Sequence, residues 1–238
     1  MLFSYEATDR GLVRAVNEDS IAAFEPSVFV VADGMGGEAA GEVASRMLVQ
    51  AVKRELNGQA GIGREELEMA LQAANREILS AADNKPEYQG MGTTATLLHV
   101  DTGKNMAFWA HVGDSRLYLY RSGQMEQITE DHSYVAGLVA QGQITEAEAR
   151  VHPQKNMLLR AVGVNRQLEV DTGSFELKSG DILLLATDGL MKQLADERIA
   201  SFLSASDGDI AKKLVSEAVA MGGRDNVSVI VVVYKDGA

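Results

Sequence analysis

TTATLLHVDTGKNMAFWAHVGDSRLYLYRSGQMEQIT, residues 93–129, is the stretch of the chain that decides the fold. It contains three apolar segments and two turn sequences, Asp101-Thr102-Gly103-Lys104 and Arg121-Ser122-Gly123-Gln124. Short turns of this composition between apolar segments are typical of β-hairpins. Because a hairpin pairs a strand with its sequence neighbour, the stretch predicts antiparallel sheet rather than a parallel fold with alternating helices.

Strands are also predicted on both sides of this stretch. Residues 20–33, SIAAFEPSVFVVAD, contain two apolar segments around a turn at 25–27, and residues 4–11, SYEATDRG, alternate weakly. Further strands are predicted at 168–177, 181–189 and 226–234. The last of these reads NVSVIVVVY, so we expect it to be deeply buried.

Helices are predicted in two pairs. Apolar side chains recur at helical spacing in residues 43–56 and again in residues 67–78. A second pair, 196–205 and 207–223, begins with acidic capping residues. The helices of the first pair have one apolar stripe each, so they should cover a sheet rather than lie inside one. The sequence therefore predicts an α+β fold.

The composition is that of one soluble globular domain. The 238 residues carry a formal net charge of -12, contain no cysteine and include no apolar run of membrane-spanning length. The missing thiols exclude disulfides, thiolate metal sites and a cysteine nucleophile, and the negative charge disfavours nucleic acid and anionic membranes as partners. With no recognisable signal peptide at the start, we expect a cytoplasmic protein.

Acidic residues lie at the ends of the most apolar segments. Asp33, Asp114 and Asp188 each follow such a segment, and Asp225 comes just before one. An Asp-Gly pair is a common turn, and acids also cap strands, so each acid alone is explained by local structure. Four of them suggest a shared site, because clustered carboxylates repel one another unless a cation neutralises them. Oxygen ligands of this kind suit Mg²⁺ or Mn²⁺.

The glycines after Asp33 allow a second interpretation. Gly34, Gly36 and Ala39 match the loose dinucleotide-binding pattern of an oxidoreductase. However, Asp33 would face the pyrophosphate, and no strand ends in an acid about 20 residues later, as that pattern requires. A phosphate-binding loop of the other common type would need a lysine followed by serine or threonine, which is not present. We therefore favour the metal site.

A further cluster, RAVNEDS, covers residues 14–20. The planar guanidinium of Arg14 suits phosphate oxygens. Glu18 and Asp19 could hold metal-bound waters. The alternative explanation is a solvated turn.

Taken together, these motifs resemble those of a known family. RAVNEDS, VVADGMGG, GMGTTAT, VGDSRLYLYR, ITEDHS, LATDGL and GGRDNVSVIVV occur in the order found in the metal-dependent protein phosphatases, also called PPM or type 2C. The chain resembles the compact bacterial serine/threonine phosphatases of this family from about Thr8 to Val233. The resemblance implies a four-layer α-β-β-α sandwich, in which two antiparallel sheets are flanked by helix pairs.

The resemblance also implies roles for the residues already singled out. Asp33 would bridge two Mn²⁺ or Mg²⁺ ions, and Gly34 would contribute its carbonyl. Asp188 and Asp225 would bind the second ion, while Asp114, with Asp188, would match an additional metal site. Arg14 would hold the substrate phosphate, and Glu18 and Asp19 would act through metal-bound water. Residues 132–160, which lack a regular strand pattern, would form a flap beside the site within a single catalytic domain, 1–238.

The implied reaction is hydrolysis of phosphoserine or phosphothreonine by direct attack of a metal-activated water. Many eukaryotic relatives carry a histidine where this chain has Met35, so either a metal-bound water would protonate the leaving oxygen or the leaving group would be less demanding. Bacterial relatives often carry histidine at the position of Glu38, and neither residue is assigned a catalytic role. His132 and His152 are the histidines of the flap that could reach substrate, whereas His99 and His111 are expected in the core or at a sheet edge.

Phosphorylated proteins are the expected partners, and a serine/threonine kinase or its substrates are the natural candidates. A monomer is expected. The alternative to an active enzyme is a catalytically weak, phosphopeptide-binding pseudophosphatase. Its signature would be a missing metal ligand, and every ligand implied by the resemblance is present.

Overall fold

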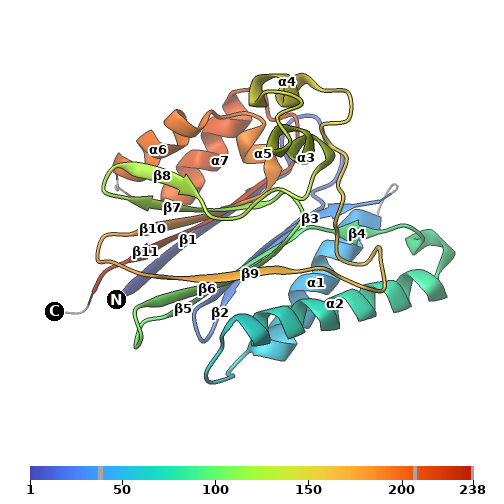
Figure 1. Ribbon diagram of the computed structural model, residues 1–238, viewed down its shortest axis with the longest axis horizontal. Coiled ribbons are helices and arrows are strands. Elements are labelled where there is room, and N and C mark those ends of the chain that lie inside the picture. The colour runs from blue at the N-terminus through green and yellow to red at the C-terminus, as the bar shows by residue number, and fades with distance from the viewer. Residues whose placement is uncertain (37–39, 206–207, 237–238) are drawn as a thin grey trace.

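The computed structural model describes residues 1–36, 40–205 and 208–236 of the chain. Two β-sheets lie face to face, and helices cover the outer face of each (Figure 1). Every strand pair among the described residues is antiparallel. The predicted α+β fold, a four-layer α-β-β-α sandwich, is confirmed.

The two sheets differ in strand order. One runs β1-β11-β10-β7-β8, and its strands are β1 (Leu2–Asp9), β11 (Val227–Tyr234), β10 (Ile182–Ala186), β7 (Arg116–Arg121) and β8 (Gln124–Gln127). The other runs β2-β3-β5-β6-β9, and its strands are β2 (Asp19–Phe24), β3 (Val28–Met35), β5 (Ala95–Asp101), β6 (Met106–Val112) and β9 (Asp171–Glu176). The short β4 (Gly92–Thr93) pairs with the end of β3.

The central strands are buried on both faces. In β3, Val28 and Val30 belong to the core shared with helices, whereas Phe29 and Val31 belong to the core between the sheets. The alternation follows from the two-residue period of a strand. Complete burial of an aliphatic side chain contributes about 1.5–3 kcal/mol, so both interfaces stabilise the sandwich. The same double burial explains the apolar run of residues 229–234 in β11.

The helices form the outer layers. α1 (Ala40–Leu56) and α2 (Arg64–Asn84) cover the sheet that contains β3, and a 3-10 turn, Pro86–Tyr88, follows α2. α6 (Asp196–Ala205) and α7 (Ile210–Ala220) cover the other sheet together with α5 (Asp188–Met191). Both predicted helix pairs are therefore confirmed. The single turn of α5 is too short to show a periodic pattern in the sequence.

The predicted hairpin turns are present. Arg121 and Gln124 are register partners, so β7 and β8 are joined by a two-residue loop of Ser122 and Gly123 with φ of 53° and 83°. Two positive φ values in succession are what the favoured two-residue hairpin loops require. Between β5 and β6, Asp101 pairs with Met106 across the other predicted turn.

The connection from β6 to β7 passes from one sheet to the other. It consists of residues 113–115, with Gly113 at a φ of 113°. A Cβ atom at Gly113 would lie 2.6 Å from Cγ2 of Thr94. The crossing therefore leaves no room for a side chain at this position. Asp114 is in the middle of the crossing, at an end of the sandwich where both sheets contribute residues.

Residues 132–160 contain two short helices, α3 (Tyr134–Ala140) and α4 (Glu146–Val151). Figure 1 shows them together at the top of the view, above the sheets. Their function as a flap, within one domain, stays a prediction. Across the described ranges, no helix has both the length and the apolar character needed to cross a membrane.

Candidate metal centre

Strand ends bring the predicted acidic residues to one end of the sandwich. Asp33 lies near the end of β3 and is the register partner of Asp19, the first residue of β2. Asp188 begins α5 directly after β10, and Asp225 lies two residues before β11. Because β10 and β11 are antiparallel neighbours, these last two residues also meet at the same edge.

Asp19 links the two sheets at this end. Its Oδ2 atom accepts hydrogen bonds from Thr187 Oγ1 (2.9 Å), just after β10, and from Ser228 Oγ (2.6 Å), in β11. Its other oxygen, Oδ1, is buried without a hydrogen-bond partner. Burial raises the pKa of Asp19 to about 7, although the hydroxyl groups of Ser228 and Thr187 oppose the change.

The backbone of Asp33 is fixed by two threonines. Its N–H donates to Thr94 Oγ1 (2.9 Å), and its carbonyl accepts from Thr94 N–H (2.9 Å) and Thr93 Oγ1 (3.0 Å). Thr94 Oγ1 also bonds Ser115 Oγ (2.7 Å), the residue after Asp114. The threonines of GMGTTAT therefore hold Asp33 and Asp114 in a fixed relation.

The carboxyl groups of this end raise one another's pKa. Burial raises the pKa of Asp33 well above its usual range, and Asp19, Asp188 and Asp114 raise it further. The pKa of Asp114 is raised to about 8, mainly by burial and next by the negative charge of Asp188. Burial also raises the pKa of Asp188. Repulsion of this kind is relieved when a cation binds between the carboxylates.

Two basic side chains join the cluster through Asp225. Arg14 Nε lies 2.8 Å from Asp225 Oδ1, and Lys192 Nζ lies 2.7 Å from Asp225 Oδ2 and 2.5 Å from Asp188 Oδ2. Burial alone would raise the pKa of Asp225, but Lys192 and Arg14 hold it below its usual value.

Asn226 positions the loop that carries Arg14. Its Oδ1 accepts from the N–H of Glu18 (2.8 Å), and its Nδ2 donates to the carbonyls of Arg10 and Val16 (both 2.9 Å). One buried amide thereby connects three points of the loop between β1 and β2 to the start of β11. Consequently Arg14 is held beside Asp225.

Gly34 is packed too tightly to carry a side chain. Its N–H donates to the carbonyl of Glu18 (3.1 Å), and a Cβ atom would lie 2.0 Å from the carbonyl oxygen of Gly41 in α1. A Cβ atom at Gly41 would in turn lie 2.5 Å from Glu18 Oε1. The carboxylate of Glu18 therefore lies against the first turn of α1, next to the end of β3.

The donor set fits a hard divalent cation. It consists of carboxylate oxygens, the ligands that Mn²⁺ and Mg²⁺ prefer. Asp19 Oδ1 and Asp188 Oδ1 are buried without a hydrogen-bond partner, as expected for atoms that a cation would satisfy. Within residues 1–36, 40–205 and 208–236, however, no three acidic or histidine side chains are already arranged as a metal site. Instead, the ammonium of Lys192 lies between two of the carboxylates.

Every residue of the predicted site lies at this end, but the metal-binding roles stay predictions. The sequence did not single out Lys192, Asn226 or the two hydroxyl partners of Asp19. Lys192 follows Asp188 by four residues, a helical spacing that was available as a signal. Met35 ends β3 opposite Gly92 and has no proton to donate. Glu38 lies outside the described residues.

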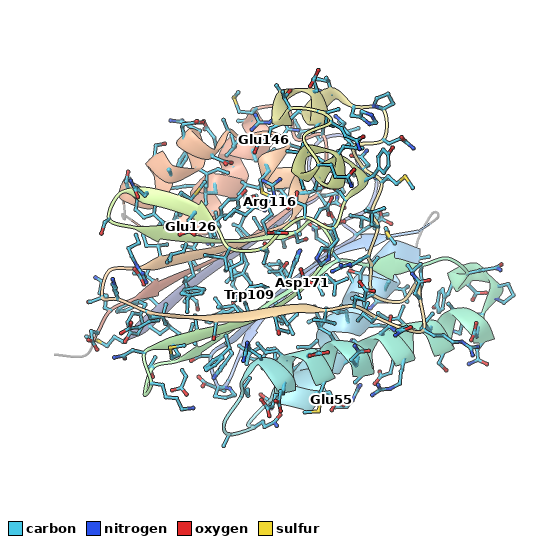
Figure 2. All side chains as sticks on the ribbon, viewed as in Figure 1. Glu55, Trp109, Arg116, Glu126, Glu146 and Asp171 are labelled. Carbon is cyan, nitrogen blue, oxygen red and sulfur yellow. The ribbon has the colours of Figure 1, made fainter. Side chains whose placement is uncertain are left out.

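The base of the predicted flap is held by His132. This buried ring accepts from Gly113 N–H through Nδ1 (3.2 Å) and bonds Asp171 Oδ2 through Nε2 (3.0 Å). Arg160 donates to the other carboxylate oxygen of Asp171 (2.9 Å). Figure 2 labels Asp171. Both ring nitrogens of His132 are therefore engaged in hydrogen bonds of the fold, and contact with substrate stays a prediction. His99 and His111 are buried, as expected.

Comparisons with known proteins agree with this arrangement. A family model described as "Protein phosphatase 2C" matches residues 13–216. The chain is 39% identical over 226 residues to the serine/threonine protein phosphatase PstP of Mycobacterium tuberculosis, covering 94% of this chain but 43% of that protein. The chain thus spans less than half the length of this relative.

Two further similarities cover nearly complete chains. The serine/threonine phosphatase stp of Listeria innocua is 37% identical over 236 residues, with 94% of this chain and 93% of that protein covered. The crystal structure of the PstP catalytic domain in complex with two manganese ions is 37% identical and superposes with a TM-score of 0.89, covering 99% of each chain.

Proposed function

The chain belongs to the protein phosphatase 2C family, and on that basis we propose that it is a metal-dependent enzyme that hydrolyses phosphoserine and phosphothreonine in proteins. The observation that supports this most directly is the cluster of Asp33, Asp114, Asp188 and Asp225 beside Arg14. It combines oxygen donors for divalent cations with a guanidinium for phosphate. The dinucleotide-binding alternative has no support, since it requires a parallel sheet.

The residues proposed to hold two Mn²⁺ or Mg²⁺ ions are Asp33, the Gly34 carbonyl, Asp188 and Asp225, with Asp114 serving a further site and Glu18 and Asp19 acting through water. When bound, such ions supply the nucleophile, because they lower the pKa of water toward neutrality. No side chain is then needed as a nucleophile.

Arg14 is proposed to bind the phosphoryl group of the substrate. Its ion pair with Asp225 uses Nε, and the two terminal nitrogens form the fork that suits phosphate oxygens. Asp225 and Asn226 orient this side chain, so the phosphate would be held at the edge of the acidic cluster. A guanidinium there would also offset charge that develops on the phosphoryl oxygens.

Protonation of the leaving oxygen cannot come from Met35, because a thioether carries no proton. His132 is engaged at the base of the flap segment. We therefore assign this proton to a solvent molecule at the site, and not to the side chain of Met35 or His132.

The partners follow from the reaction. Phosphorylated proteins are the substrates of a serine/threonine phosphatase, and we propose a serine/threonine kinase or its targets as the specific partner. The cytoplasmic location and the monomeric state expected from the sequence remain part of this proposal.

The proposal is tested by hydrolysis of p-nitrophenyl phosphate and of a phosphothreonine peptide with added Mn²⁺. We expect Asp33→Asn to reduce turnover by at least about 100-fold, a loss typical of a group that stabilises the transition state. Asp101→Asn, in the surface turn between β5 and β6, is the matched control and should retain activity. If the wild-type protein binds the phosphopeptide but turns it over no faster than Asp33→Asn, the chain is a pseudophosphatase instead.

A further inference from the structure

Lys192 places an ammonium group inside the acidic cluster. Its Nζ atom lies 2.5 Å from Asp188 Oδ2 and 2.7 Å from Asp225 Oδ2. The side chains are 30%, 17% and 14% exposed, respectively, so this is not a solvated surface ion pair of small energetic consequence. Lys192 closes α5, and its N–H donates to the carbonyl of Asp188 (2.9 Å).

The ammonium uses one oxygen of each carboxylate. On Asp225 the other oxygen pairs with Arg14, whereas on Asp188 the other oxygen is buried with no hydrogen-bond partner. Two carboxylates this close repel one another unless a positive charge lies between them. Lys192 supplies that charge from within the chain, at atoms that are proposed metal ligands.

We propose that Lys192 is a built-in counter-cation of the metal centre. It holds Asp188 and Asp225 together before metal binds, and it competes with a divalent ion for their Oδ2 atoms. This inference rests on the metal-dependent function proposed above. It makes Lys192 a positioning residue that lowers metal affinity, rather than a catalytic residue.

The chemistry of lysine suits such a role. A flexible four-carbon stem carries the charge, so the ammonium can leave the carboxylates while the backbone of α5 stays in place. Asp188 and Asp225 would then already be in position when the ion arrives, because Lys192 had kept their carboxylates from repelling one another. The residue therefore stabilises the protein without metal and opposes metal uptake at the same time.

The experiment compares wild type, Lys192→Met and Lys192→Arg. Isothermal titration with Mn²⁺ measures affinity, and thermal melting in EDTA measures stability without metal. We expect Lys192→Met to bind Mn²⁺ at least about tenfold more tightly, because a competing charge-assisted contact is removed, and to melt at a lower temperature in EDTA. Lys192→Arg keeps the charge and should stay close to wild type in the titration.

Lys212→Met is the matched control. Lys212 pairs with Asp209 at the exposed start of α7 (3.2 Å), so its loss should leave Mn²⁺ affinity unchanged. Circular dichroism with Mn²⁺ present establishes that each variant is folded. Unchanged or weaker Mn²⁺ binding by folded Lys192→Met would overturn this role alone. An absence of Mn²⁺ binding by wild type would overturn the metal centre as well.

Discussion

Gly34 shows how little room the candidate metal centre leaves at the scale of single atoms. The nearest backbone oxygen, from Gly41, would lie 2.0 Å from an added Cβ. We expect Gly34→Ala to lower the free energy of unfolding by about 1–3 kcal/mol, the usual result of forcing atoms into a packed site. Urea unfolding measures this value.

Gly137 provides the comparison for that experiment. It lies in α3, where an added Cβ atom would meet no neighbouring atom within 4 Å, so Gly137→Ala should stabilise the helix by up to about 1 kcal/mol. The two glycine variants should therefore shift the urea midpoint in opposite directions. A midpoint for Gly34→Ala equal to that of wild type would contradict the packing described here.

His111 gives a prediction for pH. Burial, followed by the nearby charge of His132, lowers the pKa of His111 from 6.5 to about 4. The unfolded chain binds this proton first, so the stabilising contribution is complete above pH 6.5 and is lost as the pH falls toward 4. Between pH 7 and pH 5 this single group should account for about 2 kcal/mol.

The contribution of His111 can be isolated with His111→Gln. Urea unfolding of this variant and of wild type should be compared at both pH values, because other groups titrate in the same range. We expect the free energy of unfolding to fall less steeply toward acid in the variant. Equal slopes would show that His111 does not titrate as described.

Single residues of the candidate site could be predicted from the sequence where the residues next to them form a recognisable pattern. Asp33, Asp114 and Asp188 each end an apolar run, so their pattern is visible without a structure. Asn226 has no such signal, because its partner Glu18 is 208 positions away. For Lys192 the spacing from Asp188 was visible in the sequence, but its second contact, with Asp225, forms only after folding.

At the scale of elements, the loop between β1 and β2 depends on one amide. Asn226→Ala would leave the N–H of Glu18 and two loop carbonyls without their partner. We expect a loss of about 1–3 kcal/mol in stability for an unsatisfied buried group. Because Arg14 belongs to this loop, KM for a phosphopeptide should also rise, which steady-state kinetics would detect.

Asn84→Ala is the control for this loop. Asn84 donates to Ser80 at the exposed end of α2, so its removal should change neither KM nor stability by more than about 0.5 kcal/mol. If Asn226→Ala leaves KM unchanged, the loop does not need this amide to position Arg14.

Elements with long or well-marked patterns were predictable. The turn sequence at residues 121–124 predicts the β7–β8 hairpin, and the two outer helix pairs follow from apolar periodicity. Short elements could not be predicted, because β4 and α5 contain too few residues to show a periodic pattern. The crossing of residues 113–115 between the sheets depends on tertiary packing, and no local pattern marks it.

At the scale of the whole molecule, metal should stabilise the sandwich, because the proposed ligands come from both sheets. A ligand at about 100 times its Kd adds about 2.7 kcal/mol, which corresponds to about 5–10 °C in Tm for a chain of this size. Thermal melting with Mn²⁺ and with EDTA should show this difference. Asp33→Asn should reduce this difference in Tm. An equal increase in Tm with Mn²⁺ in that variant would contradict the proposed role of Asp33 as a metal ligand.

The strand order has a consequence for biosynthesis. β11 lies between β1 and β10, pairs with β1 from Leu2–Tyr234 to Asp9–Val227, and follows every other described strand along the chain (Figure 1). Asp225 and Asn226 immediately precede it. Residues 225–234 must therefore leave the ribosome before β11 can insert between β1 and β10. Until then, a nascent polypeptide has neither the last of the proposed acidic ligands nor the anchor of the Arg14 loop, so it should be inert toward phosphate esters until residues 225–234 have emerged.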